Sequence, residues 1–306
     1  MHTVRDLVRH AASRFGAAGI GYGHGTDNAY DEAVWLVCWT LHLPIEHYPD
    51  LADGTVAASE SAAVLRLIAA RCDRRQPLAY LTGEAWLLGY RFRSDARALV
   101  PRSPIAEVLV NGLLDGWLSP ALQSAAEPGP TPVARILDLC TGGGSLAIIA
   151  ADRFPGAAVT GADLSADALA LAADNVGDYA LGERVRLRHG DLFAALDAAD
   201  RFDLIVCNPP YVNADSIARL PAEYRAEPGG ALAGGADGMD LIARILAGAA
   251  AHLQPDGLLV LEIGHEQRHF TARFPTLAAT TVATAGGPDR IVAITAAALI
   301  DWQPPR

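Results

Sequence analysis

Six short apolar segments in the second half of the chain alternate with amphipathic stretches, and this alternation restricts the fold more than any other feature. The segments are "VARILDL", "AAVTGADL", "RVRLRHGDL", "FDLIVCN", "GLLVLEI" and "RIVAIT". Runs rich in Val, Ile and Leu are typical of strands buried on both faces, and helices between them allow parallel pairing. The sequence therefore predicts an α/β domain with a doubly wound, mainly parallel sheet.

Residues 1–82 have a helical pattern instead. The stretch "DNAYDEAVWLVCWTLHLP" spaces its apolar residues three and four apart, with Asp27 as the expected N-cap. In "SESAAVLRLIAARC" the same spacing puts Arg66 and Arg71 on the outward face. We predict a small helical domain over residues 1–82.

Residues 83–101 are predicted to be a β-hairpin connector. The stretch "AWLLGYRFRSDARALVP" alternates in polarity and has a turn signal at Ser94 and Asp95. Residues 102–306 then form the α/β domain, whose first helix is expected to have Ser103 as N-cap and Pro104 at its first position. The Pro- and Gly-rich stretch "SAAEPGPTPVA" reads as a surface loop.

Composition narrows the class of protein. The net charge of -11 argues against a broad basic face for DNA or RNA. The four cysteines have no CxxC spacing and no histidine cluster, which indicates neither a disulfide framework nor a metal site, and all four are expected to be buried. The N-terminus lacks the apolar core of a signal peptide, and no apolar run is long enough to span a membrane. We expect a cytoplasmic protein without a membrane partner.

A glycine loop follows the first predicted strand, in "ILDLCTGGGSLAIIA". Gly142 and Gly144 allow a sharp turn that brings backbone N–H groups and a helix N-terminus against a ligand. The second strand ends at Asp163, about 20 residues later, where a carboxylate can accept hydrogen bonds from ribose hydroxyls. Asp191 ends the third strand and could accept from an adenine amino group. These strand ends together fit one adenosine-containing ligand.

The choice of ligand depends on charge. The Walker pattern is absent, whereas the looser dinucleotide pattern would tolerate Ala147 in place of its last glycine. Acidic strand ends suit a cationic cofactor better than a phosphate-rich one, so we expect S-adenosyl-L-methionine. Asp138 would meet the amino group of this cofactor, and Leu192 or Phe193 would pack against its adenine ring.

The segment "CNPPYV" ends the fourth predicted strand with a rigid corner. Pro209 and Pro210 lack backbone donors, so the strand stops at Asn208. The Asn208 side-chain oxygen and the Pro209 carbonyl can each accept one hydrogen of a planar NH₂ group, and Tyr211 can pack on its plane. Such a rigid corner at the end of a strand is a candidate active site.

These segments, with "LPAEYRAEPGGALAGGADGMD" and "LEIG", resemble the HemK/Prm family of S-adenosylmethionine-dependent protein-glutamine methyltransferases. The resemblance implies a Rossmann-like class I methyltransferase sheet, catalytic residues Asn208, Pro209, Pro210 and Tyr211, and a substrate-recognising N-terminal domain. The implied cofactor-binding residues are Asp138, Thr141, Gly142, Gly144, Asp163, Leu164, Asp191, Leu192 and Asn208. The loop "CTGGGS" differs from the more usual "CTGSGC", but both outer glycines remain.

The stretch "LVPRSPIAEVL" is similar to the PrmB branch, which methylates a glutamine of ribosomal protein three of the large subunit, the expected partner here. The branch acting on release factors reads Pro-Arg-Pro-Asp-Thr-Glu there and is the first alternative. A nucleic-acid adenine methyltransferase and a non-catalytic scaffold are less favoured. Arg102 and Glu107 could line the substrate entrance, Glu262 could support the site or cap a helix, and His189 is expected to be structural.

Overall fold

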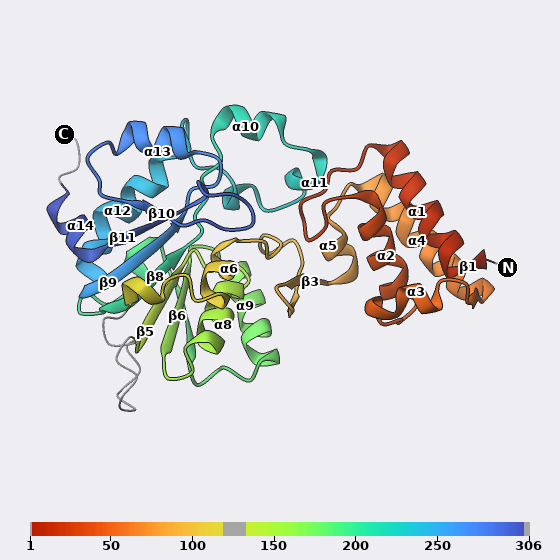
Figure 1. Ribbon diagram of the computed structural model, residues 1–306, viewed down its shortest axis with the longest axis horizontal. Helices are drawn as coiled ribbons and strands as arrows, with labels where there is room; N and C mark the ends of the chain where they lie inside the picture. The colour runs from red at the N-terminus through yellow and green to blue at the C-terminus, as the bar shows by residue number, and fades with distance from the viewer. Residues whose placement is uncertain (1, 119–132, 303–306) are drawn as a thin grey trace.

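The six predicted strands form six of the seven strands of one sheet in the computed structural model, which describes residues 2–118 and 133–302. The sheet order is β10-β11-β9-β8-β5-β6-β7 (Figure 1). The strands are β5 Arg135–Leu139, β6 Ala158–Asp163, β7 Val185–His189, β8 Phe202–Cys207, β9 Leu253–Glu262, β10 Thr280–Thr281 and β11 Ile291–Thr295. Only β10 was not predicted, because two exposed threonines give no apolar signal.

Parallel pairing joins β7, β6, β5, β8 and β9, whereas β11 runs antiparallel to both of its neighbours. The chain moves outward from β5 to β7 and then crosses back to β8 on the other side of β5. Ligands bind where the strand order reverses in this way, outside the carboxyl ends of the strands. In this sheet the reversal lies between β5 and β8.

Helices cover both faces of the sheet (Figure 1). Leu204 and Val206 of β8 pack into the core on one face, with apolar residues of α6, α8 and α9. Ile205 and Cys207 alternate with them and pack on the other face, with α12, α13 and α14. These helices are α6 Ile105–Val110, α8 Ser145–Arg153, α9 Ala166–Asp178, α12 Asp240–His252, α13 Gln267–Arg273 and α14 Ala296–Asp301.

The N-terminal helices have a core of their own, in which Phe15, Leu36 and Ile68 are buried. The elements are β1 His2–Thr3, α1 Val4–Ala18, α2 Ala29–Thr40, η1 Ile45–His47, α3 Tyr48–Leu51, β2 Thr55–Val56, α4 Ala58–Arg74 and α5 Leu78–Thr82. The predicted N-cap Asp27 is wrong by one residue. The Asn28 side chain caps α2 by accepting from the N–H groups of Tyr30 and Asp31.

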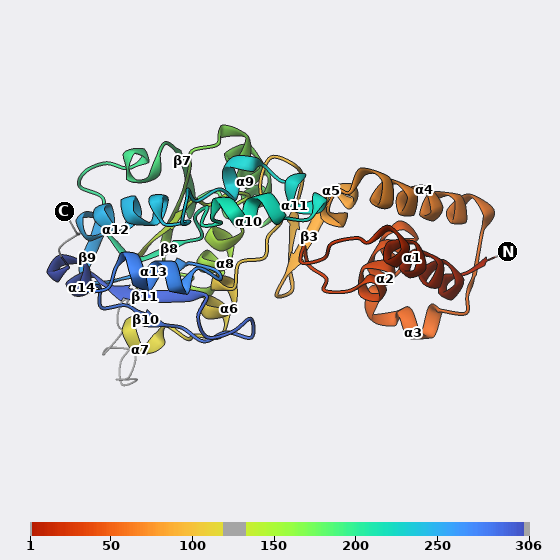
Figure 2. The same cartoon turned by 90° about the horizontal axis from the view of Figure 1, so that it is seen from above.

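The hairpin β3 Glu84–Leu87 and β4 Tyr90–Arg93 stands between the two parts, as predicted (Figure 2). Its turn, however, is at Leu88 and Gly89, which both have positive φ, and not at Ser94 and Asp95. Two residues with φ above zero match the twist of a tight hairpin. The turn was not predicted here, because the alternation of polar and apolar residues gave no turn signal at this position.

Short elements complete the part of the chain that the structure describes. They are α7 Asp115–Leu118, η2 Leu192–Ala195, α10 Ala214–Arg219, α11 Ala222–Arg225 and η3 Gly229–Ala231. The predicted loop "SAAEPGPTPVA" falls almost entirely outside the described residues. None of the helices described has the length and apolar character that crossing a membrane requires.

Buried ion pairs join the helical part to the segment around α11, and here the prediction for Arg71 is wrong. Its side chain is fully buried and not on an outward face. The guanidinium Nε lies 2.6 Å from Glu32, and Nη1 lies 3.3 Å from Glu223. Arg75 also pairs with Glu223, at 2.7 Å. The helical part is therefore held against the segment that follows the Asn-Pro-Pro-Tyr corner. The domain boundaries at residues 82 and 101 stay a prediction.

Candidate active site

Two adjoining pockets open at the carboxyl ends of the central strands, and each encloses about 370 Å³. We call the first the β7 lobe, because Asp191 and Leu192 at the end of β7 line it. The second is the loop lobe, lined by the glycine loop and Asn208. Both lobes share a wall that includes Asp163 and Pro210, so they form one elongated site.

The glycine loop is held by Asp163 at the end of β6. One carboxylate oxygen of Asp163 accepts the Gly142 N–H at 2.8 Å, and the other accepts the Ser165 N–H at 2.8 Å. Gly142 and Gly144 both have positive φ, the conformation for which glycine was expected. Each Asp163 oxygen keeps a second lone pair that can face the shared wall of the two lobes.

Asp138 lies beneath this loop and is fully buried. One of its oxygens accepts from the Thr141 hydroxyl at 2.5 Å and from the Ala147 N–H at 2.9 Å. The other oxygen, Oδ1, has no partner among the described residues. Burial raises the pKa of Asp138 to about 7, although the two hydrogen bonds favour the charged form. A cationic ligand group beside this buried, unpartnered oxygen would stabilise the charged form of the carboxyl.

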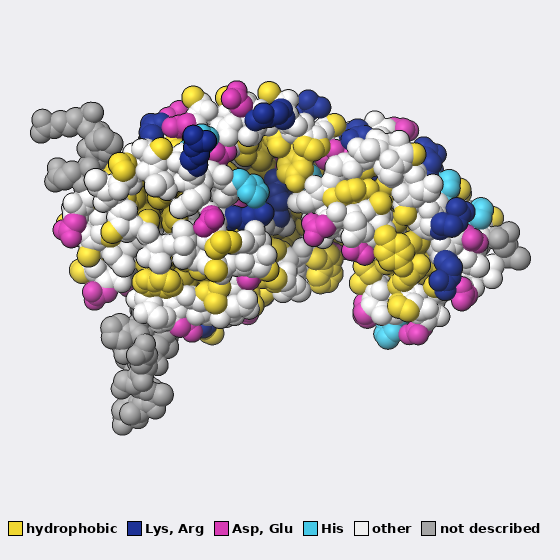
Figure 3. Space-filling model, turned by 45° about the horizontal axis from the view of Figure 1, so that its top comes forward, with side chains coloured by type: hydrophobic (Ala, Val, Ile, Leu, Met, Phe, Trp, Pro, Cys, Tyr) yellow, Lys and Arg dark blue, Asp and Glu magenta, His cyan; other side chains and the backbone are white. Residues whose placement is uncertain are grey.

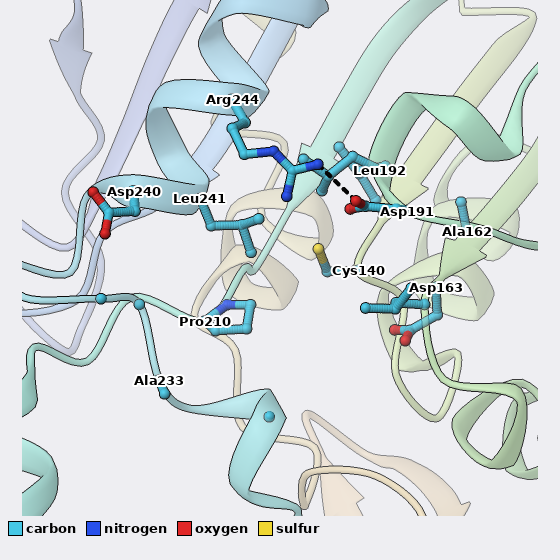
Figure 4. A pocket seen from close by; sticks show the side chains of 15 residues that line it. Cys140, Ala162, Asp163, Asp191, Leu192, Pro210, Ala233, Asp240, Leu241 and Arg244 are labelled. Atoms are coloured by element: carbon cyan, nitrogen blue, oxygen red, sulfur yellow. Dashed lines mark hydrogen bonds and ion pairs between the residues drawn. The ribbon is translucent and has the colours of Figure 1, made fainter.

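The β7 lobe contains a cation that the sequence did not reveal (Figure 4). Arg244 of α12 reaches across the lobe and pairs with Asp191 at 2.7 Å. Leu192 lines this lobe with φ of 51°, a conformation that leucine rarely adopts. Phe193 does not line it, because its ring stacks on His252 with centroids 5.0 Å apart. Leu192 is thus the one of the two predicted ring contacts that faces the lobe.

The Asn-Pro-Pro-Tyr corner forms one wall of the loop lobe. Asn208 and Pro210 line the lobe, whereas Pro209 is buried behind them. The Asn208 side chain makes no hydrogen bond to any described residue, and neither does the Pro209 carbonyl. Both acceptors therefore remain available to a ligand.

Tyr211 lies differently from the prediction. Its hydroxyl donates to Glu262 at 2.7 Å, and its ring packs over Gly264, where an added Cβ would lie 2.3 Å from Cε2. Ser103 donates to the other oxygen of Glu262 at 2.5 Å. Burial raises the pKa of both Tyr211 and Glu262. The ring lines neither lobe, so the structure gives Tyr211 a supporting position behind the corner, and its packing on a ligand amide stays a prediction.

Arg102 lines the loop lobe and is fixed by the buried Glu227, at 2.6 and 2.7 Å. Burial would raise the pKa of Glu227, but Arg102 and His24 hold it at about 2. His24 of the helical part lies 3.3 Å from the same carboxylate. The wall of the loop lobe is thus connected to the N-terminal helices. Glu107 does not line the lobe, because its carboxylate accepts from the Ala285 N–H.

Other predicted residues are distributed as follows. Thr141, Gly142, Asp163 and Leu164 line the loop lobe, and Leu164 is 66% exposed there. The His189 ring makes its one side-chain hydrogen bond within the described residues to the Leu164 carbonyl, at 2.9 Å. Cys140 is not buried as expected, but lines both lobes with φ of 62°.

One wall of the site was not predicted from the sequence: it is formed by residues 228–235, Leu241 and Arg244. The glycine-rich stretch "EPGGALAGG" was the only local signal of this wall. Among the described residues, no three His, Cys, Asp or Glu side chains come together as metal ligands would.

The chain is similar to known methyltransferases. The chain matches the sequence model of the Methyltransferase small domain over residues 122–222. The ribosomal protein uL3 glutamine methyltransferase of Bordetella pertussis is 54% identical over 96% of this chain and 95% of its own length. That of Burkholderia pseudomallei is 51% identical over 97% of this chain and 95% of its own. The catalytic domain of human Mettl16 superposes with a TM-score of 0.50, over 78% of this chain and 81% of that chain, at 13% identity.

The fold and the strand-end site define a class I methyltransferase of the S-adenosylmethionine-dependent kind. The predicted fold class is therefore confirmed. The two relatives, which match over nearly their full length, identify the family within this class. The chain belongs to the family of ribosomal protein uL3 glutamine methyltransferases.

Proposed function

We propose that the chain transfers a methyl group from S-adenosyl-L-methionine to the side-chain amide nitrogen of a glutamine in ribosomal protein uL3, in the cytoplasm. One observation carries the proposal: the unpartnered side chain of Asn208 lines a lobe whose floor is a glycine loop held by Asp163. Family membership supplies the substrate, since the relatives are named for it.

The residues of the two lobes fit the cofactor. Asp138 lines neither lobe, but its unpartnered Oδ1 beneath the glycine loop would suit a cationic amino group there, and the free lone pairs of Asp163 would suit ribose hydroxyls. Asp191 and Leu192 would hold the adenine in the β7 lobe. When bound, S-adenosylmethionine supplies an electrophilic methyl on a positively charged sulfur.

The corner would position the nucleophile. A glutamine amide nitrogen is a poor nucleophile, because its lone pair is delocalised into the carbonyl, so orientation has to supply most of the rate. The Asn208 oxygen and the Pro209 carbonyl would each accept one N–H of the glutamine, which fixes its NH₂ group. The two prolines keep this corner rigid, and the buried Tyr211–Glu262 hydrogen bond braces it from behind.

Charge supports the choice of a ribosomal protein. The chain carries a net charge of -11, and ribosomal proteins are strongly basic, so their encounter would be accelerated at low salt. A release factor is not comparably basic. Nucleic acid, which the same corner could serve through a flipped adenine, would be repelled by this charge.

The test is transfer of labelled methyl from S-adenosylmethionine to purified uL3, a peptide release factor and an adenine-containing oligonucleotide, side by side. We expect labelled uL3, little labelled release factor and no labelled DNA, with a rate on uL3 that falls as salt rises. A preference for either other substrate would reject the proposal.

A further inference from the structure

A third cavity, of about 680 Å³, lies between the helical part and strand β3 and shares no lining residue with the two lobes of the active site. We call it the tryptophan groove, because Trp35 and Trp39 of α2 and Trp86 of β3 line it. Trp35 and Trp39 are one helical turn apart and face the same side. Trp86 is 49% exposed on the opposite wall. Figure 3 shows a hydrophobic area on the helical part of the molecule and a notch between this part and the rest of the surface.

The polar lining of the groove is acidic. Asp31, Glu46 and Glu84 line it, and no arginine, lysine or histidine does. Glu84 is balanced by Arg91 at 2.9 Å, but neither Asp31 nor Glu46 takes part in an ion pair within the described residues. Trp86 is exposed and Trp35 and Trp39 are half-buried. Indole faces beside unbalanced carboxylates attract cations, since the ring face and the carboxylate both favour positive charge. The same carboxylates would repel the phosphates of RNA.

We propose that the tryptophan groove is the docking site for an Arg- and Lys-rich segment of the substrate protein, bound with cationic side chains against the indole rings. This inference rests on the proposed function and names the surface that selects its substrate. The hairpin connects the two places: β3 lines the groove, and the chain that leaves β4 reaches the wall of the loop lobe at residues 97–103. A substrate could therefore be held at the groove while its glutamine enters the lobe.

Variants of exposed groove residues test this docking. Trp86→Ala and Glu46→Lys are each expected to raise the Kd for purified uL3 about tenfold, with kcat at saturating uL3 unchanged. Each variant has a matched control elsewhere on the chain. Trp117→Ala removes another partly exposed indole, in α7, and Asp73→Lys reverses another exposed charge, in α4. Both controls are expected to bind uL3 as the unaltered chain does, and all four variants to bind S-adenosylhomocysteine equally.

The absence of lysine from the chain offers an independent test by cross-linking. A carbodiimide joins carboxylates to amines, so cross-links between this chain and uL3 can come only from its own carboxylates, or from its N-terminal amine. Peptide mapping is expected to find Asp31 or Glu46 joined to lysines of uL3.

The outcomes separate the two proposals. If the unaltered chain binds uL3 through the groove but transfers no methyl to it, the proposed function fails and the docking surface stands. If uL3 is methylated, but Trp86→Ala and Glu46→Lys bind it like their controls and the cross-links map elsewhere, the docking surface is refuted. Displacement of uL3 by a single-stranded RNA that binds the groove would refute it as well.

Discussion

The buried carboxyl of Asp138 gives the most quantitative prediction. Asp138→Asn keeps an oxygen that can accept from Thr141 and Ala147, and it replaces the unpartnered Oδ1 with an uncharged group. The substitution therefore removes a titration with little change in shape. We expect the stability of the unaltered chain to depend on pH between 4 and 7 in a way that the variant does not share.

The magnitude follows from the difference between two pKa values. Burial raises the pKa of Asp138 from 3.8 to about 7 on folding, so the folded state binds the proton more tightly than the unfolded state. The stabilisation from this proton is fully present below the unfolded pKa, and it is lost as pH rises through the folded pKa. The slope is about 1.4 kcal/mol per pH unit within this window. From pH 5 to 7, the free energy of unfolding of the unaltered chain should fall by roughly 2 kcal/mol relative to the variant, because the slope halves at the folded pKa.

Urea unfolding at a series of pH values measures this difference. Asp73→Asn, which alters an exposed carboxylate in α4, is the matched control. The reasoning would be refuted if the unfolding free energies of Asp138→Asn and of the unaltered chain differed by the same amount at every pH from 5 to 8. That result would show that the folded protein does not raise the pKa of Asp138.

Three further predictions concern the site. Asn208→Ala should leave S-adenosylmethionine binding intact by calorimetry but lower kcat by roughly 10²-fold, as the loss of one preorganised hydrogen-bonding group does; near-normal turnover would disprove the role of the corner. Asp163→Ala should weaken that binding at least about tenfold, because charge-assisted hydrogen bonds to ribose and to the loop are lost; unchanged affinity would contradict it. Gly264→Ala puts a Cβ 2.3 Å from the Tyr211 ring, so it should reduce the free energy of unfolding by about 1–3 kcal/mol and lower kcat more than it lowers the affinity for the cofactor. Urea denaturation and kinetics with wild-type values would show that the ring does not support the corner.

The parts of the site that could be predicted are those whose residues are contiguous in the sequence. The glycine loop, Asp163 and the corner each follow a strand directly, so the sheet alone brings them together. Residues at the ends of adjacent strands become neighbours through the strand order alone, independently of the rest of the chain.

The parts that could not be predicted depend on pairs far apart in sequence. Arg71 has the spacing of an outward-facing residue, and its burial is explained by Glu32 and Glu223, which lie 39 and 152 positions away. Arg244 lies in an ordinary amphipathic helix until the fold brings it against Asp191, 53 positions away. Periodicity describes one helix at a time, so it cannot show which buried charge has a distant partner.

The segment that follows the corner serves two surfaces at once. Glu223 and Glu227 receive Arg71 and His24 from the helical part, and the next residues, from Pro228 to Ala231, line the loop lobe. An exchange of the N-terminal helices with those of a relative would leave the buried carboxylate of Glu223 without Arg71 and Arg75, at a cost of about 3–5 kcal/mol for a broken buried pair. Such chimeras would need to carry residues 221–231 with the helices. The two halves of this chain are thus expected to evolve together, with changes in the way that the helices sit matched by changes at the mouth of the active site.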